Sequence, residues 1–186
     1  MKNVIFSGHI WVLTDREGCL IEDIDTDQIY HNAYLHITER SQMGKYALGN
    51  LSGWEDFSRK VKPGDILAAG RNFGAGSSRQ QAVDCFAALG VSLILAPSFG
   101  AIYFRNAVNS GFPVIRFPNL KDLVKSGSLI TGEKIEIDLS SGKGSVRKRA
   151  IAFQIEPLRE VQSAIYQAGS LFNYGRGIES NSDKKC

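Results

Sequence analysis

The sequence predicts an α/β fold in which a parallel βαβ core is followed by an antiparallel hairpin. Between residues 65 and 117, short apolar runs alternate with amphipathic helical stretches, which is typical of βαβ units and a parallel sheet. Residues 134–139 and 146–155 instead alternate apolar and polar side chains on either side of a glycine-containing turn, which indicates an antiparallel hairpin. The 186 residues, 43% of them hydrophobic, are enough to bury a core.

Before this core, the pattern predicts one strand and a long irregular stretch. Residues 3–13 predict a strand because β-branched and aromatic side chains dominate them. Residues 23–50 are polar and punctuated by small residues, and they predict a long loop of the kind that is functional or mobile. Ser52 is the expected cap of a short helix over residues 54–61, which a Pro-Gly pair then ends.

The core itself begins with a short buried strand at residues 65–70 and a glycine-rich turn at 71–78. A helix is expected from Ser78 to the residue before Gly90, because its apolar positions recur with helical spacing. Residues 91–96 are uniformly apolar and predict a fully buried strand.

A second helix should begin at Ser98, its expected cap, and end at Gly111. It is followed by a strand at residues 112–117. A final helix is expected over residues 158–168, with a polar tail that frays from Gly175.

Charge and cysteine content exclude several classes of protein. The formal charge of +3 comes from 22 basic and 19 acidic residues spread along the chain, and the one basic cluster, 147–149, is expected on a solvated hairpin strand. Nucleic acid is therefore not an expected partner. Cys19, Cys85 and Cys186 are odd in number and far apart, so they indicate neither a disulfide framework nor a metal site. With no signal-peptide or membrane-length apolar segment, we expect a cytoplasmic protein without membrane contact.

The most informative segment is G-R-N-F-G-A-G-S-S-R at residues 70–79. It lies between a predicted strand and a predicted helix, where free N–H groups favour an anion. It lacks the G-K-[ST] of a P-loop, and Arg79 stands where a dinucleotide fingerprint needs glycine, so a carboxylate is the more plausible ligand. The alternative is a tight turn in which Ser77 or Ser78 only caps the helix.

This segment, the following L-I-L-A-P-S-F-G-A-I-Y-F-R-N and G-F-P-V-I, and the earlier D-I-D-T-D-Q-I resemble the swivelling domain of the aconitase superfamily. The similarity is greatest to the small subunits of 3-isopropylmalate dehydratases, and it covers most of residues 1–172. The resemblance implies a swivelling β/β/α domain over 1–172, followed by a polar, flexible tail at 173–186.

The resemblance also implies roles for individual residues. Ser77 corresponds to the catalytic base, while Ser78 and Arg79 correspond to residues that hold substrate carboxylate. Gly76 belongs to the same substrate-binding turn. The family reads the variable group of its substrate just after a Tyr-Leu pair, so Tyr34, Leu35 and His36 are expected to contact substrate; these side chains decide neither for an alkyl group nor for a carboxylate.

The family reaction, as the resemblance implies it, is a dehydration and rehydration that converts 2-isopropylmalate into 3-isopropylmalate in leucine biosynthesis. A 4Fe-4S cluster should be carried by a separate large subunit, in a heterodimer or heterotetramer, with no cofactor bound by this chain alone. The acidity of serine adds one requirement: a serine hydroxyl is a very weak acid, so its surroundings must stabilise an alkoxide.

Three residues depart from the family's usual G-C-G-S-S-R-E-H. Ala75 replaces the cysteine, and Gln80 and Gln81 replace glutamate and histidine. The last two changes remove a carboxylate and an imidazole next to Arg79, so the support around it is expected to differ.

Alternatives remain open at this point. The chain could serve a homoaconitase, a citraconate hydratase or a dimethylmalate hydratase, or it could be a non-catalytic carboxylate-binding module. Asp25 and Asp27 could in principle ligate a metal, although capping a short helix is the more ordinary role for Asp in such a turn.

Overall fold

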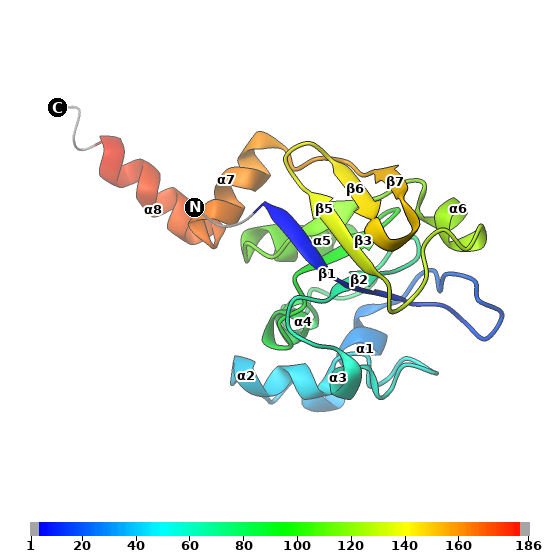
Figure 1. Cartoon of the computed structure of the whole chain (residues 1–186). Coiled ribbons are helices and arrows are strands. Elements are labelled where there is room, and N and C mark those ends of the chain that lie inside the picture. The colour runs from blue at the N-terminus through cyan, green and yellow to red at the C-terminus, as the bar shows by residue number, and fades with distance from the viewer. Residues whose placement is uncertain (1–3, 183–186) are drawn as a thin grey trace.

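A seven-stranded mixed sheet forms the centre of the molecule in the computed structural model, which describes residues 4–182 (Figure 1). The strand order is β4-β3-β2-β1-β5-β6-β7. The strands are β1 (Ile5–Val12), β2 (Ile66–Ala68), β3 (Leu93–Ala96), β4 (Val114–Arg116), β5 (Lys134–Asp138), β6 (Lys143–Val146) and β7 (Ile151–Gln154).

Strand β1 joins a parallel half of the sheet to an antiparallel half. It pairs in parallel with β2, where Ile10 faces Ile66, and antiparallel with β5, where Phe6 faces Ile137. The pairs β2-β3 and β3-β4 are parallel, whereas β5-β6 and β6-β7 are antiparallel. The predicted α/β fold with a parallel core and an antiparallel hairpin is therefore confirmed.

The antiparallel half has one more strand than the sequence predicts. Arg147–Arg149 form a 3-10 turn, η3, between β6 and β7, so the prediction that this basic cluster lies on a strand is wrong. Ala150 follows with a left-handed φ of 52°, which breaks the extended run. Arg149 donates hydrogen bonds to the carbonyls of Gly127 and Ser128, and these contacts hold η3 against the loop that precedes β5.

Eleven helical segments surround the sheet in the described part of the chain. They are α1 (Thr26–Ile29), η1 (Asn32–Tyr34), α2 (Arg40–Met43), η2 (Gly44–Tyr46), α3 (Phe57–Lys60), α4 (Gln81–Ala88), α5 (Ala101–Asn109), α6 (Leu120–Lys125), η3 (Arg147–Arg149), α7 (Glu160–Ala168) and α8 (Leu171–Ser182).

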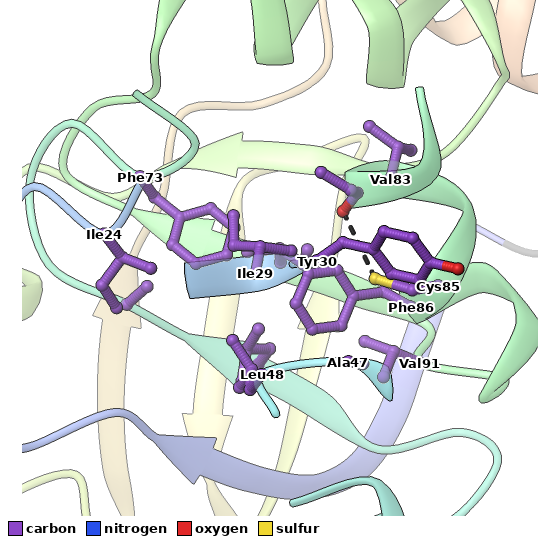
Figure 2. Packing of buried hydrophobic residues seen from close by; sticks show 14 of the residues in the cluster. Ile24, Ile29, Tyr30, Ala47, Leu48, Phe73, Val83, Cys85, Phe86 and Val91 are labelled. Carbon is purple, nitrogen blue, oxygen red and sulfur yellow. Dashed lines mark hydrogen bonds between the residues drawn. The ribbon is translucent and has the colours of Figure 1, made fainter. Parts of the chain in front are cut away.

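The segment 23–50 is not the irregular loop that its polarity predicts. Four short helices follow one another in it, and Ile29, Tyr30 and Leu48 are fully buried beneath them. Figure 2 shows Tyr30 and Leu48 packed close to Phe86 of α4. The apolar residues are too sparse to produce a helical period, yet each one anchors a turn of chain on the core.

Two predicted helix caps are wrong. Helix α3 begins after Asp56, not at Ser52, and α5 begins after Gly100, not at Ser98. The Ser98 hydroxyl instead accepts a hydrogen bond from the Asn72 backbone N–H at 2.9 Å. A serine caps a helix only if the helix begins directly after it, and both of these helices begin further along the chain.

The C-terminal region is more helical than expected. Helix α7 lies within the predicted range, but α8 runs to Ser182, where the sequence predicts a tail that frays from Gly175. The Ser170 hydroxyl accepts a hydrogen bond from the Asn173 N–H at 3.1 Å at the start of α8. The boundary predicted after residue 172 thus falls inside a helix that projects from the body of the molecule (Figure 1). Within residues 4–182, no helix has both the length and the apolar character needed to cross a membrane.

Candidate active site

The turn at residues 70–79 lies against the segment that begins at residue 23. The Gly74 N–H donates to the carbonyl of Ile24 at 2.7 Å, and the Thr26 N–H donates to the carbonyl of Ala75 at 2.9 Å. These bonds align the two segments in parallel, with a bridge between Asp25 and Ala75. Two stretches 50 residues apart in the sequence therefore form one surface.

The loop after β3 supports the turn from its other side. The Phe73 N–H donates to the carbonyl of Ser98 at 3.1 Å, and the Gly100 N–H donates to the carbonyl of Phe73 at 2.9 Å. Because β2 and β3 are parallel, the loops that follow them emerge at the same edge of the sheet. The site lies at this carboxyl edge, where ligands of α/β proteins commonly bind.

Gly74 is required by the geometry of the turn. Its φ of 77° is left-handed, and a Cβ atom built on it would lie 2.2 Å from Cγ of the buried Tyr103. No rotation of a flexible side-chain end removes this contact, because Tyr103 packs edge-on against Phe73 at a centroid distance of 5.3 Å. Glycine therefore lets the turn pack directly on α5.

The two serines are exposed, and neither caps α4. The helix begins at Gln81 after Gln80, with no side-chain hydrogen bond at the cap, so the prediction of a helix from Ser78 is wrong by three residues. The Ser77 Oγ lies 3.1 Å from Oγ1 of Thr26. The Ser78 carbonyl accepts a hydrogen bond from Nδ2 of Asn106 at 3.3 Å. The cap-only interpretation of Ser77 and Ser78 is therefore wrong.

Arg79 is held by an ion pair that the sequence analysis did not identify. Its Nη1 lies 2.6 Å from Oδ1 of Asp27, and its Nη2 donates to Oδ2 of Asp27 at 2.8 Å. Nη1 also donates to the carbonyl of Tyr30 at 3.2 Å. The Arg79 side chain is 15% exposed, against 42% for Asp27, so the guanidinium is the better buried partner.

This ion pair changes the acid–base properties of both groups. The hydrogen bond from Arg79 lowers the pKa of Asp27, and a second hydrogen bond from the Asn32 N–H acts in the same direction. The Asp27 carboxylate raises the pKa of Arg79. Both groups are therefore fully charged at neutral pH.

The five N–H donors of Arg79 can be counted individually. One donor on each Nη faces Asp27, and the second donor on Nη1 faces the carbonyl of Tyr30. The Nε–H and one Nη2–H have no partner among the described residues. These two lie along the same edge of the planar guanidinium and form a fork that fits one carboxylate.

The specificity loop predicted at Tyr34, Leu35 and His36 is connected to Arg79 through Tyr30. Tyr34 stacks on Tyr46 with a centroid distance of 4.0 Å, and its carbonyl accepts a hydrogen bond from the hydroxyl of Tyr30 at 3.1 Å. Leu35 and His36 are exposed beyond it. Tyr30 thus connects the predicted specificity loop to Arg79, since its own carbonyl is an Arg79 acceptor.

Thr26 and Asp27 are site residues that the sequence analysis missed. Both belong to the D-I-D-T-D-Q-I stretch at residues 23–29, which carried the resemblance without a role for either of them at Ser77 or Arg79. Asp25 has the capping role expected of it, because its Oδ1 accepts from the Gln28 N–H at 2.8 Å in a capping box. The contacts of Thr26 with Ser77 and of Asp27 with Arg79 span about 50 positions of sequence, so only the tertiary structure reveals them.

Gln80 also has a definite environment. Its Nε2 donates to the hydroxyl of Ser110 at 2.7 Å and to Oδ1 of Asp84 at 3.3 Å. Asp84 is in turn paired with Arg40 of α2 at 3.2 Å. The neutral glutamine amide therefore links the start of α4 to the end of α5 through Ser110, and it donates to the Asp84 carboxylate, which an acidic side chain at this position would repel.

The residues described here do not fit an iron–sulfur cluster. Between residues 4 and 182, no group of three or more His, Cys, Asp and Glu side chains is placed to hold a metal ion. Cys19 is exposed, while Cys85 is buried in the core beside Phe86 (Figure 2), and burial raises the pKa of its thiol. A thiol that resists ionisation is a poor cluster ligand.

Comparison with known proteins defines the class to which this fold and site belong. The family model of the aconitase C-terminal domain matches residues 21–120, which include the 23–29 stretch, the 70–79 turn and the loop after β3. The chain belongs to the aconitase C-terminal domain family.

Within that class, the relatives point to one kind of subunit. A 3-isopropylmalate dehydratase small subunit from Caldicellulosiruptor saccharolyticus is 36% identical, over 84% of this chain and 86% of its own length. A small subunit 2 of the same enzyme from Archaeoglobus fulgidus is also 36% identical, over 82% of this chain and 88% of its own. The crystal structure of a 3-isopropylmalate dehydratase from Methanocaldococcus jannaschii superposes with a TM-score of 0.82 at 30% identity, covering 98% of this chain and 99% of that one.

Proposed function

We propose that this chain is the small subunit of a hydro-lyase that, together with a large subunit, interconverts 2-isopropylmalate and 3-isopropylmalate in leucine biosynthesis. The observation that carries the proposal is the exposed Ser77 beside an Arg79 whose remaining donors form a carboxylate fork. The names of the relatives supply the substrate. Those relatives give no support to the homoaconitase, citraconate or dimethylmalate alternatives.

Arg79 would bind one substrate carboxylate through its Nε–H and free Nη2–H. Asp27 and the Tyr30 carbonyl hold the guanidinium in place from the opposite side, so little side-chain freedom is lost when substrate binds. The hydroxyl of Ser78 would add a hydrogen bond to the same carboxylate. Gly76, whose φ is 96°, would let the backbone approach the substrate closely.

Ser77 would act as the base. In the dehydration direction, its alkoxide oxygen forms an O–H bond with the proton on the carbon next to the carboxylate. The electron pair of the broken C–H bond forms the new C=C bond, and the hydroxyl group leaves the neighbouring carbon with the C–O electron pair. Rehydration with the hydroxyl and proton on exchanged carbons gives the isomer.

Tyr34, Leu35 and His36 would contact the variable group of the substrate. The exposed Leu35 and His36 lie at the open end of the loop, and Tyr34 is fixed from behind by its stack on Tyr46. This arrangement offers an apolar contact for an isopropyl group.

A partner subunit is needed to complete the site. Ser77 and Ser78 are exposed, so this chain alone does not exclude water from the reacting groups. The described cysteines do not fit a 4Fe-4S cluster, and we therefore assign that cluster to the large subunit, in a heterodimer or heterotetramer. Cys19 and Cys85 are free thiols, which is consistent with a protein that functions in a reducing cytoplasm.

The test is a pair of serine variants measured in the assembled enzyme. Ser77→Ala should lower kcat by several orders of magnitude with little change in KM, because its oxygen acts only as the transition state forms. Ser78→Ala should raise KM as well, since its hydroxyl contacts substrate in the ground state. Melting curves of both variants provide the control. Normal turnover in Ser77→Ala would show that the base has been assigned wrongly.

A further inference from the structure

Thr26 is unusual among the polar residues of this protein because it is buried directly behind the exposed Ser77. The residue is 2% exposed, and the other buried polar residue in the described core is Asp65 at 5%. Burial of a hydroxyl is costly unless it forms hydrogen bonds, so the bonds of Thr26 show what the residue does.

The hydroxyl of Thr26 makes two contacts, both with Ser77. It accepts a hydrogen bond from the Ser77 backbone N–H at 3.2 Å, and its Oγ1 lies 3.1 Å from the Ser77 Oγ. A hydroxyl has one proton and two lone pairs. Since the Ser77 N–H occupies one lone pair of Thr26, the proton of Thr26 remains available to the Ser77 oxygen.

The direction of this bond depends on the protonation state of Ser77. While Ser77 carries its proton, either hydroxyl can donate to the other. Once Ser77 is an alkoxide, it has no proton to give, and only Thr26 can donate. A donor fixed by burial and aimed at a charged oxygen stabilises that charge without having to reorganise.

Helix α4 supplies less of this stabilisation than the sequence suggests. Its first helical residue is Gln81, four positions beyond Ser77, and Ser77 does not cap it. The Asp27 carboxylate next to Thr26 is neutralised by Arg79, so it does not dominate the local field. The Thr26 hydroxyl is a side-chain donor that lies at the Ser77 oxygen and can supply stabilisation that the more distant helix start does not.

We propose that Thr26 is a positioning residue for Ser77, whose hydroxyl fixes the Ser77 side chain and donates a hydrogen bond to its oxygen in the alkoxide form. This inference rests on the proposed function of Ser77 as the base. It adds a specific partner, 51 positions away in the sequence, that makes a serine usable in this role.

The experiment uses the complex with its large subunit and five variants. Thr26→Val removes the hydroxyl at nearly constant size and should lower kcat roughly 10²–10³-fold, as loss of one preorganised donor does, with KM nearly unchanged. Its kcat should also need a higher pH, because the Ser77 alkoxide is less stable. Thr26→Ser keeps the hydroxyl and should recover most of the turnover.

A double variant separates positioning from other effects. If Thr26 acts through Ser77, adding Thr26→Val to Ser77→Ala should not lower the residual turnover further. The matched control is Thr131→Val, because the Thr131 hydroxyl bonds to the backbone of Val12 and not to Ser77, so its loss should leave kcat unchanged.

Two results would overturn the proposal. One is wild-type kcat and pH profile in Thr26→Val, and the other is a further full loss when Thr26→Val is added to Ser77→Ala. Should Thr26→Val fail to assemble, Thr26→Ser decides, because low turnover in a well-folded Ser variant would mean that the methyl group matters and not the hydroxyl. Normal turnover in Ser77→Ala would instead contradict the proposed function itself.

Discussion

The two halves of the sheet are built by different rules and do different work. In the parallel half, β2 and β3 are short and fully buried, and the loops that follow them carry Ser77 and support it. In the antiparallel half, β5 shows alternating burial, and its partners β6 and β7 connect through tight turns. The strands of the parallel half are therefore joined by long connections, whereas those of the antiparallel half are joined by short turns.

The difference extends to the two faces of the parallel strands. Leu67 and Ala69 point into the cluster that lies beneath the short helices of residues 23–61 and α4, whereas Ile66 and Ala68 point into the cluster shared with β5. The site borders the first cluster only. The proposed catalytic groups thus lie on the face covered by short helices and the loops between them, and such loops commonly carry binding and catalytic residues.

One charged pair from each half of the molecule shows the contrast. On the site side, the Asp27–Arg79 pair is formed with a guanidinium that is 15% exposed, and it holds a functional group in place. On the antiparallel side, Glu136 pairs with an Arg147 that is 74% exposed. Exposed pairs contribute little, so the second pair should tolerate change and the first should not.

The largest expected effect comes from Gly74→Ala. The left-handed φ costs about 1–2 kcal/mol, and the contact with Tyr103 adds roughly 1–3 kcal/mol of overpacking, so unfolding should become easier by about 2–5 kcal/mol. Gly18→Ala is the matched control, since its φ is 80° but nothing lies within 4 Å of the added Cβ. Denaturant unfolding of both variants measures the difference. Equal destabilisation would mean that Tyr103 yields without cost.

A moderate effect is expected from Asp27→Asn. The amide loses the charge that fixes Arg79, at roughly 1 kcal/mol for a partly exposed pair, so KM should rise about fivefold with kcat little changed. Glu136→Gln removes the exposed pair in the antiparallel half and should leave KM unaltered. Steady-state kinetics of the two assembled variants test this contrast, which a normal KM in Asp27→Asn would contradict.

The same pair gives a pH dependence with a definite sign. Arg79 lowers the pKa of Asp27 below its ordinary value of 3.8, so the stabilisation is present above about pH 4 and is lost as pH falls through the lowered pKa. In Asp27→Asn this acid-dependent part should be missing from the melting temperatures measured between pH 5 and pH 2.

The smallest effect should come from Asp138→Asn at the turn between β5 and β6. Hydrogen bonds from Ser140, and then from Ser141, lower the pKa of Asp138 to about 2. Its stabilisation is present above about pH 4 and is lost as pH falls through 2, so the variant should be destabilised by under about 1 kcal/mol at pH 7, and the difference should shrink as pH falls toward 2 and below. Turnover should be normal. A large loss of activity would show that the two halves are coupled after all.

Sequence patterns succeeded where a local rule governs the structure. Uniform apolar runs identified β2 and β3, and alternation identified β5 and β7, although β6 lies where a turn was predicted. The glycines at 74 and 76, which marked the informative turn, both have positive φ. Patterns failed in residues 23–50, whose scattered apolar side chains become four short helices because they are buried on the core.

The sequence by itself determined the class of fold, the turn that carries Ser77, Ser78 and Arg79, and the resemblance that the family comparison bears out. These depend on periodicity and on contiguous residues, which can be recognised without coordinates. Only the tertiary structure decided which groups surround them. Thr26 contacts Ser77 and Asp27 pairs with Arg79 across about 50 positions of sequence, and both contacts exist because two loops are hydrogen-bonded side by side at one edge of the sheet.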